Sequence, residues 1–490
     1  MKLKAALDWL KAPFLNANVR AGSVAAAKLS DDERYINVPA FARTVSGELP
    51  FYERRYADGV HHFEAGDLEA AIGAVGEYLG ATGGAELINP GKPFGLTDVH
   101  SYEDFEVRFG KLLDRKVEDW ERNKTPYPRF LTWLENARPP TVSVRGKRMM
   151  FLLPQYIMNS KRFVECDFKD HLLDTAANAG ADVEFFPTDR CSYPDISFDS
   201  AIAKAELEAL SVRIAAFKPD AIVVDGNYIP STESLNTTYL GGLKARFGFK
   251  VIVFIGDAWG SHWGAPADKW SEVGDIVFHF APETPLAKEG KFPEKLCWDA
   301  YPVNEHNFFK DAERQFDISF VGTYASVLRP FWLTVALQIA KDQGLRHRLL
   351  PHKREANNAL TMADYATVLR QSNMVLNFST HIGTQKMMTG RTWQAMTAAT
   401  VLLDEDDVFT PAYFVPFVHY MPFSTRDELA YAVRYFSQHS DKAERMGDAA
   451  AAFCFEHYSS EAIWSGLLGA AYSRTAQQAA PGPRSPSDGI

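Results

Sequence analysis

The chain is poor in cysteine and has no long apolar run. Only four of its 490 residues are cysteine (Cys166, Cys191, Cys297 and Cys454), and no two form a Cys-x-x-Cys pair. This scarcity argues against a disulfide framework and against a zinc ribbon. No run of about 18 apolar residues occurs, so no membrane-spanning helix is expected.

The N-terminal 22 residues also lack the continuous apolar core of a secretory signal. We therefore expect a cytoplasmic protein. Leucines and lysines at helical spacing near the N-terminus predict a short helix. Such a helix either packs on its own domain or makes a peripheral contact with the inner membrane face or a protein partner.

The chain also has fewer basic than acidic residues. The chain has 52 Lys and Arg against 62 Asp and Glu, for a net charge of −10. This balance excludes bulk nucleic acid as the expected partner, although a local basic site remains open. Aromatic residues make up 13%, enough for a large core, and the length predicts two or three domains.

The pattern of the chain divides it into four parts. Residues 1–145 are predicted to form a mostly helical domain that recognises an acceptor or a partner. Helix-breaking residues such as Pro139-Pro140 indicate a domain boundary near residue 145. Short apolar runs then alternate with helical stretches, as in a parallel sheet covered by helices. This alternation predicts an α/β fold with Rossmann-like domains over 146–305 and 306–474. A loose tail follows over 475–490.

Ligands in open α/β sheets bind beyond the carboxyl ends of the strands. For two facing sheets, the expected site is the cleft between them.

Four segments of the second α/β stretch resemble a known family. They are Phe316–Thr323 (FDISFVGT), Ser372–Ser379 (SNMVLNFS), Gly390–Met396 (GRTWQAM) and the closing helices of 425–457. Together they resemble the spore-maturation-protein-like glycosyltransferases of the GT-B class, which are similar to group 1 glycosyl transferases. In the first α/β stretch, FKPDAIVV also fits, and the resemblance covers about residues 148–468.

The resemblance implies a glycosyltransferase that moves a sugar from a nucleotide-sugar donor to a hydroxyl of a glycan, lipid-linked or protein acceptor. The second domain would bind the donor and the first the acceptor. No metal and no cofactor besides the donor is expected. Two alternatives stay open: a nucleotide-sugar epimerase on the same scaffold, and a degenerate GT-B binding module.

Basic and small residues at predicted helix starts indicate the donor site. Gly322 and Thr323 follow a strand and precede a helix that begins near Arg329. Backbone N–H groups at such a junction suit a diphosphate, although a plain tight turn would look the same. Lys386 and Arg391 resemble a pyrophosphate clamp. A helix start is unfavourable for basic residues by its dipole, which mildly favours an anionic ligand over a salt-bridged helix end.

Further donor-binding candidates are Gln394, His352 and His381. The family usually has a glutamate at the position of Gln394, where it accepts hydrogen bonds from ribose, and a glycine in the turn Ala398-Ala399-Thr400. Glutamine still accepts a bond but carries no charge. A lone histidine is more often structural than a ligand.

The acceptor site is predicted in the loop after the strand Lys250–Ile255. There Asp257 or His262 would act as the catalytic base of an inverting transfer, whereas a retaining transfer needs no such base. Trp259 and Trp263 would stack on a sugar ring or lie in the core. Tyr228 is a lesser acceptor-binding candidate. The acidic run Asp404–Asp407 is interpreted as a solvated loop, with no metal site expected there.

Overall fold

The structure is a computed structural model, and it describes most of the chain beyond residue 100. The described residues are 62, 70, 73–74, 93–96, 99, 101–124, 126–137, 140–156, 165–192, 199–256, 264–281, 293–311, 313–323, 328–352, 360–382, 385–407 and 409–477. The predicted N-terminal helix lies outside them, and so does the predicted tail of 475–490 except for residues 475–477, which are helical instead.

The chain forms two compact units, and each combines two separate stretches of sequence. The first α/β unit consists of Arg129–Glu305 and Glu456–Ile490, and the second of Met1–Pro128 and His306–Phe455. This division differs from the expected domains at both ends. The expected helical domain of 1–145 is split between the units, and the last helix belongs to the first unit instead of the second.

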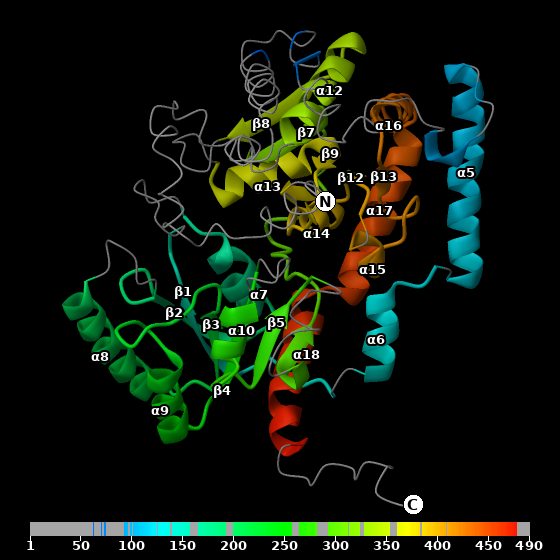
Figure 1. Cartoon of the computed structure of the whole chain (residues 1–490). Coiled ribbons are helices and arrows are strands. Elements are labelled where there is room, and N and C mark those ends of the chain that lie inside the picture. The colour runs from blue at the N-terminus through cyan, green and yellow to red at the C-terminus, as the bar shows by residue number, and fades with distance from the viewer. Residues whose placement is uncertain are drawn as a thin grey trace, which may run out of the picture. The chain divides into compact units, whose positions relative to one another are not determined.

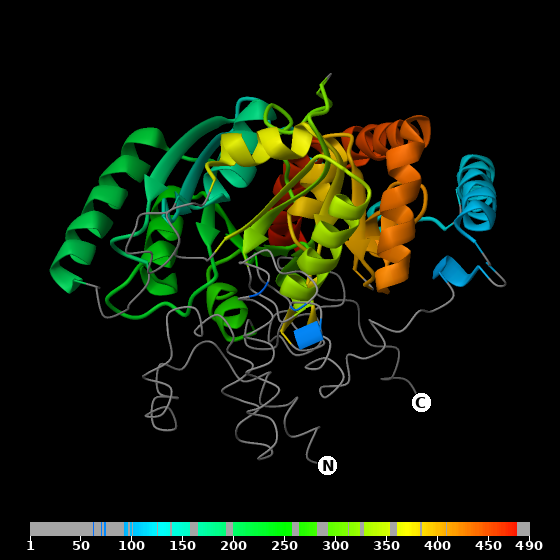
Figure 2. The ribbon, with the colours of Figure 1, turned by 90° about the horizontal axis from the view of Figure 1, so that it is seen from above.

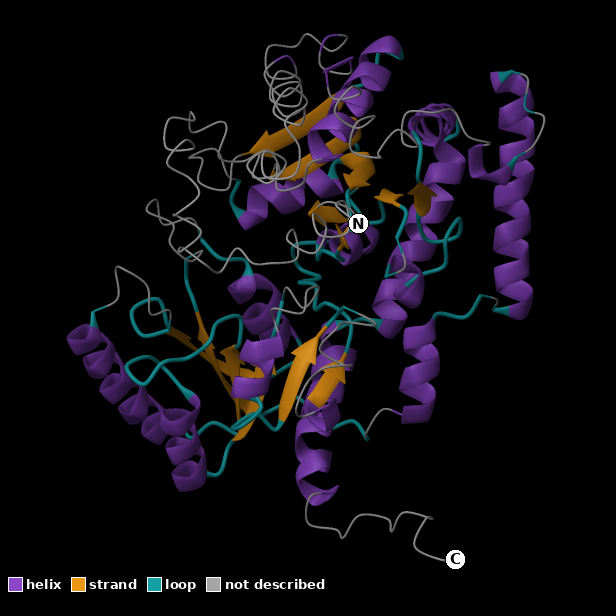
Figure 3. Cartoon of the chain, viewed as in Figure 1, coloured by secondary structure: helices purple, strands orange, loops and turns teal. Residues whose placement is uncertain are grey.

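The first unit is built on a six-stranded parallel sheet in the order β2-β1-β3-β4-β5-β6. The strands are β1 (Arg148–Leu153), β2 (Asp182–Pro187), β3 (Ala221–Asp225), β4 (Lys250–Phe254), β5 (Ile276–His279) and β6 (Leu296–Trp298). Strand β3 (AIVVD) is buried along its whole length, which is why these runs are apolar without alternation. Figure 3 shows the strands framed by helices.

The helices of the first unit include a π-helical turn. They are α6 (Arg129–Ala137), the π-helix η6 (Lys169–Asp174), α7 (Thr175–Asn178), α8 (Ser200–Phe217), α9 (Thr237–Phe247), α10 (Gly264–Trp270), the 3-10 turn η8 (Pro293–Lys295) and α18 (Ser460–Gln477). Local signals fix their ends. Asn236 caps α9 by accepting from the Tyr239 amide, and Gly248 ends it with a φ of 79°.

Helix α18 explains why the C-terminal residues join the first unit. The Trp464 ring lies edge-on to Phe151 of β1, with centroids 5.7 Å apart. Its Nε1 donates to the Thr175 hydroxyl at 2.8 Å. Gly469 packs so closely on the chain at Pro140 that an added Cβ would lie 2.0 Å from the Pro140 carbonyl oxygen. The sequence pattern predicts none of these distant contacts.

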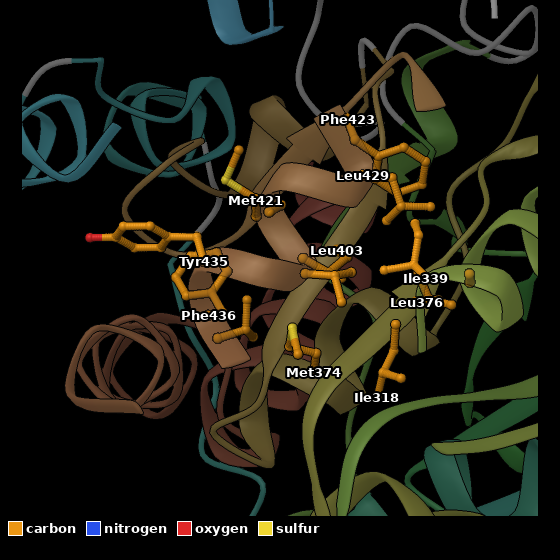
Figure 4. Close-up of a cluster of buried hydrophobic side chains, with 14 of the residues drawn as sticks. Ile318, Ile339, Met374, Leu376, Leu403, Met421, Phe423, Leu429, Tyr435 and Phe436 are labelled. Atoms are coloured by element: carbon orange, nitrogen blue, oxygen red, sulfur yellow. The ribbon is translucent and has the colours of Figure 1, made fainter. Parts of the chain in front are cut away.

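The second unit is built on a five-stranded parallel sheet in the order β13-β12-β9-β7-β8. The strands are β7 (Phe316–Thr323), β8 (His347–His352), β9 (Ser372–Asn377), β12 (Val401–Glu405) and β13 (Met421–Phe423), with a small hairpin of β10 (Thr380–Ile382) and β11 (Gln385–Lys386). Ile318, Met374, Leu403 and Met421 bring one face of four neighbouring strands into a common core. Figure 4 shows these side chains together with Tyr435 and Phe436 from a covering helix.

The helices of the second unit come from both of its stretches. They are the turn η5 (Pro93–Gly95), α5 (Tyr102–Asn123), α12 (Leu328–Asp342), α13 (Met362–Arg370), α14 (Arg391–Thr397), α15 (Thr410–Tyr413), α16 (Arg426–Gln438) and α17 (Ser440–His457). Thr425 and Glu428 form a capping box that starts α16.

Helix α5 packs against α16, which is why this N-terminal segment belongs to the second unit. Phe105 and Phe109 lie at i and i+4 on one face. Phe105 stacks on Tyr431 with centroids 4.4 Å apart, and Phe109 meets Tyr435 edge-on at 4.9 Å. Asp114 adds ion pairs to α17 through Lys442 and Arg445. Figures 1 and 2 both show α5 beside the α16 and α17 helices.

The α/β class of the fold is confirmed, because the described residues form two parallel Rossmann-like sheets. The acidic run is a correction. Strand β12 extends to Glu405, and Asp404 and Glu405 are buried instead of solvated, because residues 404 and 405 still pair with β13. Among the helices of the described residues, none is long and apolar enough to cross a membrane.

Candidate functional site

The candidate site lies at the carboxyl edge of the second sheet, where β7 ends. Gly322 is the next-to-last residue of β7. A Cβ added to it would lie 2.7 Å from Nη2 of Arg391 and 2.9 Å from the Phe320 ring. Any larger residue would therefore displace the arginine. The glycine at this position allows the close approach of the guanidinium.

Arg391 is the first residue of α14, and its side chain returns to the sheet edge. Nη2 donates to the Val321 carbonyl oxygen at 2.6 Å, and Nη1 donates to Oδ1 of Asn377 at 2.8 Å. The guanidinium carbon lies 4.9 Å from the centroid of the Phe320 ring. Within the described part of the chain, no carboxylate forms an ion pair with Arg391. Its positive charge is thus held in place by neutral groups.

Asn377 is the last residue of β9 and is buried. Its Nδ2 donates to Oδ1 of Asp404 at 2.8 Å and lies 3.3 Å from the Thr392 hydroxyl. Its Oδ1 accepts from Arg391 and from the Thr389 hydroxyl at 3.1 Å. Two strands and the start of α14 are therefore joined at one amide.

Asp404 lies beside Asn377 in register on the neighbouring strand β12. The Thr410 hydroxyl donates to its Oδ2 at 2.7 Å. Burial, reinforced by the nearby Asp407, raises the pKa of the Asp404 carboxyl well above its ordinary value. Sequence reasoning missed both Asn377 and Asp404, and the detectable signal was a polar residue ending each of two apolar strands.

Arg329 brings a second guanidinium to the same edge. It lies in the first turn of α12, the helix that follows β7, and is only 6% exposed. Its Nη2 donates to the Phe378 carbonyl oxygen, directly after β9, at 3.4 Å. Gly322, Arg329 and Arg391, all predicted from sequence, thus meet at the ends of two adjacent strands.

Gln394 is placed one turn along α14 from Arg391 and is 4% exposed. Its Oε1 accepts a hydrogen bond from the Tyr365 hydroxyl of α13 at 2.8 Å. The resemblance assigns the Gln394 side-chain oxygen to the ribose hydroxyls, but in this structure that oxygen already accepts a hydrogen bond from Tyr365. Its role toward a nucleotide stays a prediction.

Four further candidates are placed by their backbones. Thr323 and His352 are register partners at the ends of β7 and β8. His381 lies in β10, and Lys386 of β11 pairs with Thr380 in the hairpin that follows β9. All four positions therefore belong to segments that end or directly follow the strands of this edge.

The acceptor candidates belong to the first unit. Asp257, Trp259, His262 and Trp263 lie outside the described residues, so their roles stay predictions.

Tyr228 is buried, with its hydroxyl donating to the Leu235 carbonyl oxygen at 3.0 Å and its ring edge-on to Trp270. Burial raises the pKa of the Tyr228 hydroxyl well above its usual range. The described contacts of Tyr228 are thus those of a core residue.

The carboxyl edge of the first sheet carries a small polar cluster. Oδ1 of Asp225, at the end of β3, accepts from the backbone N–H of Asn227 at 3.0 Å and from its Nδ2 at 2.6 Å. Oδ1 of Asn227 accepts in turn from the Gly256 amide at 3.0 Å. This chain of bonds fixes the backbone at the start of the predicted acceptor loop.

The edge of the second sheet thus combines a close-packed glycine, the buried Arg329 and the part-buried Arg391 at the start of α14. Residues 306–469 match the family described as "Glycosyl transferase-like". This stretch is similar to that family, and the match bears out the expected class of enzyme, a glycosyltransferase. The narrower spore-maturation-protein-like assignment stays a prediction.

Solved structures similar to the chain include three proteins of low identity. Sucrose-phosphate synthase from Thermosynechococcus elongatus is 11% identical, with 69% of this chain and 100% of that one covered and a TM-score of 0.44. HepE from Anabaena, in complex with UDP, is 9% identical, with 66% and 100% covered and a TM-score of 0.43. A glycosyltransferase from Rickettsia africae is 7% identical, with 68% and 99% covered and a TM-score of 0.43. No curated protein matches the chain.

Proposed function

We propose that this protein transfers a sugar from a nucleotide-sugar donor to an acceptor hydroxyl, and that the second α/β unit binds the donor. The observation that carries the proposal is the Arg391 guanidinium, held beside Gly322 at the carboxyl end of β7. It lies within the segment that matches the glycosyl transferase-like family. A donor diphosphate is the natural ligand of such a group, because guanidinium N–H donors match phosphate oxygens.

The chemistry follows from charge. When the bond between the sugar and the diphosphate breaks, negative charge grows on the leaving nucleoside diphosphate. Hydrogen-bond donors that are already fixed in place stabilise this charge without reorganising. Arg391 and Arg329 would supply these donors from the ends of β7 and β9, with Lys386 and His381 added from the hairpin.

We further propose that no metal ion is needed for donor binding, because the protein itself brings two guanidinium groups to the diphosphate. The acceptor would be a glycan, lipid-linked or protein hydroxyl bound by the first unit near Asp257. Asp257 or His262 would remove its proton if the transfer inverts the sugar configuration.

Isothermal titration of the whole chain with UDP, GDP, ADP, CDP and dTDP tests the proposal. We expect one of these to bind, and Arg391→Gln to weaken it by roughly 10- to 100-fold, because a hydrogen bond to a charged group contributes about 1.5–3 kcal/mol. The affinity should be the same with EDTA present. A nucleotide sugar should then be consumed only when an acceptor is added.

Arg346→Gln is the matched control. Arg346 directly precedes β8 at the opposite end of the sheet, where its Nη2 pairs with Asp317 Oδ1 at 2.8 Å. This change removes a guanidinium of the same sheet and should leave nucleotide affinity unchanged. If the unaltered protein binds none of the five nucleotides, the proposal is wrong. Conversion of a nucleotide sugar without any acceptor would instead support the epimerase alternative.

A further inference from the structure

Asn377 has an orientation that its neighbours determine. Its Nδ2 donates to the Asp404 carboxyl, which offers acceptor oxygens. Its Oδ1 faces the N–H groups of Arg391 and the Thr389 hydroxyl. A flipped amide would set oxygen against oxygen at Asp404 and N–H against N–H at Arg391. Only one orientation therefore satisfies all partners.

The neutrality of Asn377 has a consequence for Arg391. An amide oxygen accepts a hydrogen bond from the guanidinium but leaves its full positive charge available. A carboxylate at the same place would hold Arg391 more tightly and cancel that charge. The nearest carboxyl in this network, Asp404, contacts Arg391 only through the amide of Asn377, at 2.8 Å on each side.

We propose that Asn377, oriented by Asp404, is the positioning residue of the donor site: it holds the Arg391 guanidinium at the end of β7 and leaves its charge uncompensated for a diphosphate. This rests on the proposed function, since the diphosphate is that of the sugar donor. Burial raises the pKa of the Asp404 carboxyl, which weakens its competition for the charge of Arg391.

Asn377→Asp separates this role from a purely structural one, because it keeps the size and the acceptor but adds a charge. We expect it to weaken binding of the nucleoside diphosphate, and of inorganic pyrophosphate, at least about tenfold at pH about 8. Relative to the unaltered protein, the loss should shrink toward pH about 6. The neighbouring Asp404 carboxyl raises the pKa of the introduced group, which favours loss of its charge as the pH falls. A general loss of packing would not recover in this way.

The matched control is Asn373→Asp, the same change at the other end of β9. Asn373 Nδ2 lies 3.4 Å from Oδ1 of Asp317, far along the strand from Arg391. This variant should bind the nucleotide as the unaltered protein does, at every pH.

Asn377→Ala provides a second measurement that does not depend on the acidic variant folding. It should weaken binding about tenfold by itself, but produce no further loss when Arg391→Gln is already present. Additive losses would show that Asn377 acts independently of Arg391 and would overturn the proposal. Unchanged affinity in both Asn377 variants would overturn it as well. If the unaltered protein binds no diphosphate, the proposed function itself is wrong. This outcome differs from failure of the Asn377 proposal, in which the unaltered protein still binds.

Discussion

His279 shows how burial alone sets the charge of a residue. It ends β5 in the first unit and is buried, with its Nδ1 3.1 Å from the Ala281 carbonyl oxygen. Burial lowers the pKa of His279 to about 4. The imidazole is therefore neutral in the folded protein at physiological pH.

We predict that His279 makes the first unit sensitive to acid. An unfolded histidine has a pKa of about 6.5, so the unfolded chain takes up a proton that the folded chain rejects until pH about 4. The free energy of unfolding should fall between these two values by up to about 3 kcal/mol, with no contribution above pH about 7. Urea unfolding at several pH values measures this fall in the free energy of unfolding.

The comparison variant is His279→Gln, whose amide can still donate to the Ala281 carbonyl but does not titrate. His171 also has a lowered pKa through burial, but it contributes equally to both proteins and cancels. A variant that loses stability with acid as steeply as the unaltered protein would show that His279 is not responsible.

At the same scale, sequence motifs indicated some residues of this sheet edge and not others. Gly322, Arg329 and Arg391 were recognisable because glycine and arginine at strand–helix junctions carry a specific chemical meaning. Asn377 was not, because a single asparagine at the end of an apolar strand resembles any strand terminus. Asp404 was misread, because an acidic run normally indicates solvent and its burial depends on Thr410 and Asn377.

At the scale of elements, Gly447 of α17 packs closely against the turn that follows α14. A Cβ added to Gly447 would lie 2.2 Å from the Ala399 carbonyl oxygen. Ala399 itself has a φ of 54°, a conformation that favours glycine. Ala399 thus holds a left-handed turn although it is not a glycine.

We predict that Gly447→Ala destabilises the second unit by about 1–3 kcal/mol or more, because the obstructing atoms are backbone and the helix must shift. Thermal unfolding followed by circular dichroism measures the loss. Gly242→Ala in α9 is the matched control, since nothing lies within 4 Å of its added Cβ. It should stabilise the protein by about 0.5–1 kcal/mol, as replacing an exposed helical glycine does. Equal effects of the two changes would contradict the packing argument.

Most of the regular elements could be predicted from the sequence, but not all of their ends. Helix α5 can be recognised in the sequence, because Ser101 caps it and its apolar residues recur at helical spacing. The start of β13 is less evident: the apolar run begins at Phe417, but the strand covers only Met421–Phe423, because Phe417 takes a φ of 65° in a turn. Periodicity does not register such tertiary constraints.

At the scale of the whole chain, sequence order and packing disagree. The pattern predicted consecutive domains, whereas the structure assigns α5 to the second unit and α18 to the first. Alternation of strands and helices reveals that two sheets exist, but it does not reveal which sheet a distant helix covers. That choice depends on particular contacts, such as Trp464 with Phe151 and Thr175.

We predict from this assignment that Trp464→Ala destabilises the first unit, although residue 464 follows the whole second sheet in sequence. The side chain is fully buried, and removing a buried tryptophan costs about 3–5 kcal/mol. Native-state hydrogen exchange should show protection lost in β1, β3 and β4. The amides of β7 and β9 should keep their protection, because they belong to the other compact unit.

Trp332→Ala supplies the mirror-image control. Trp332 is equally buried, but it lies in α12 and packs edge-on against Phe423 of β13. Its replacement should open β7, β9 and β12 and leave β1 and β3 protected. Equal loss of protection in both sheets for either variant would show that the chain unfolds as one cooperative body, and would contradict the prediction. Reciprocal patterns would show that each discontinuous unit is stabilised by its own tryptophan, since neither change touches the core of the other.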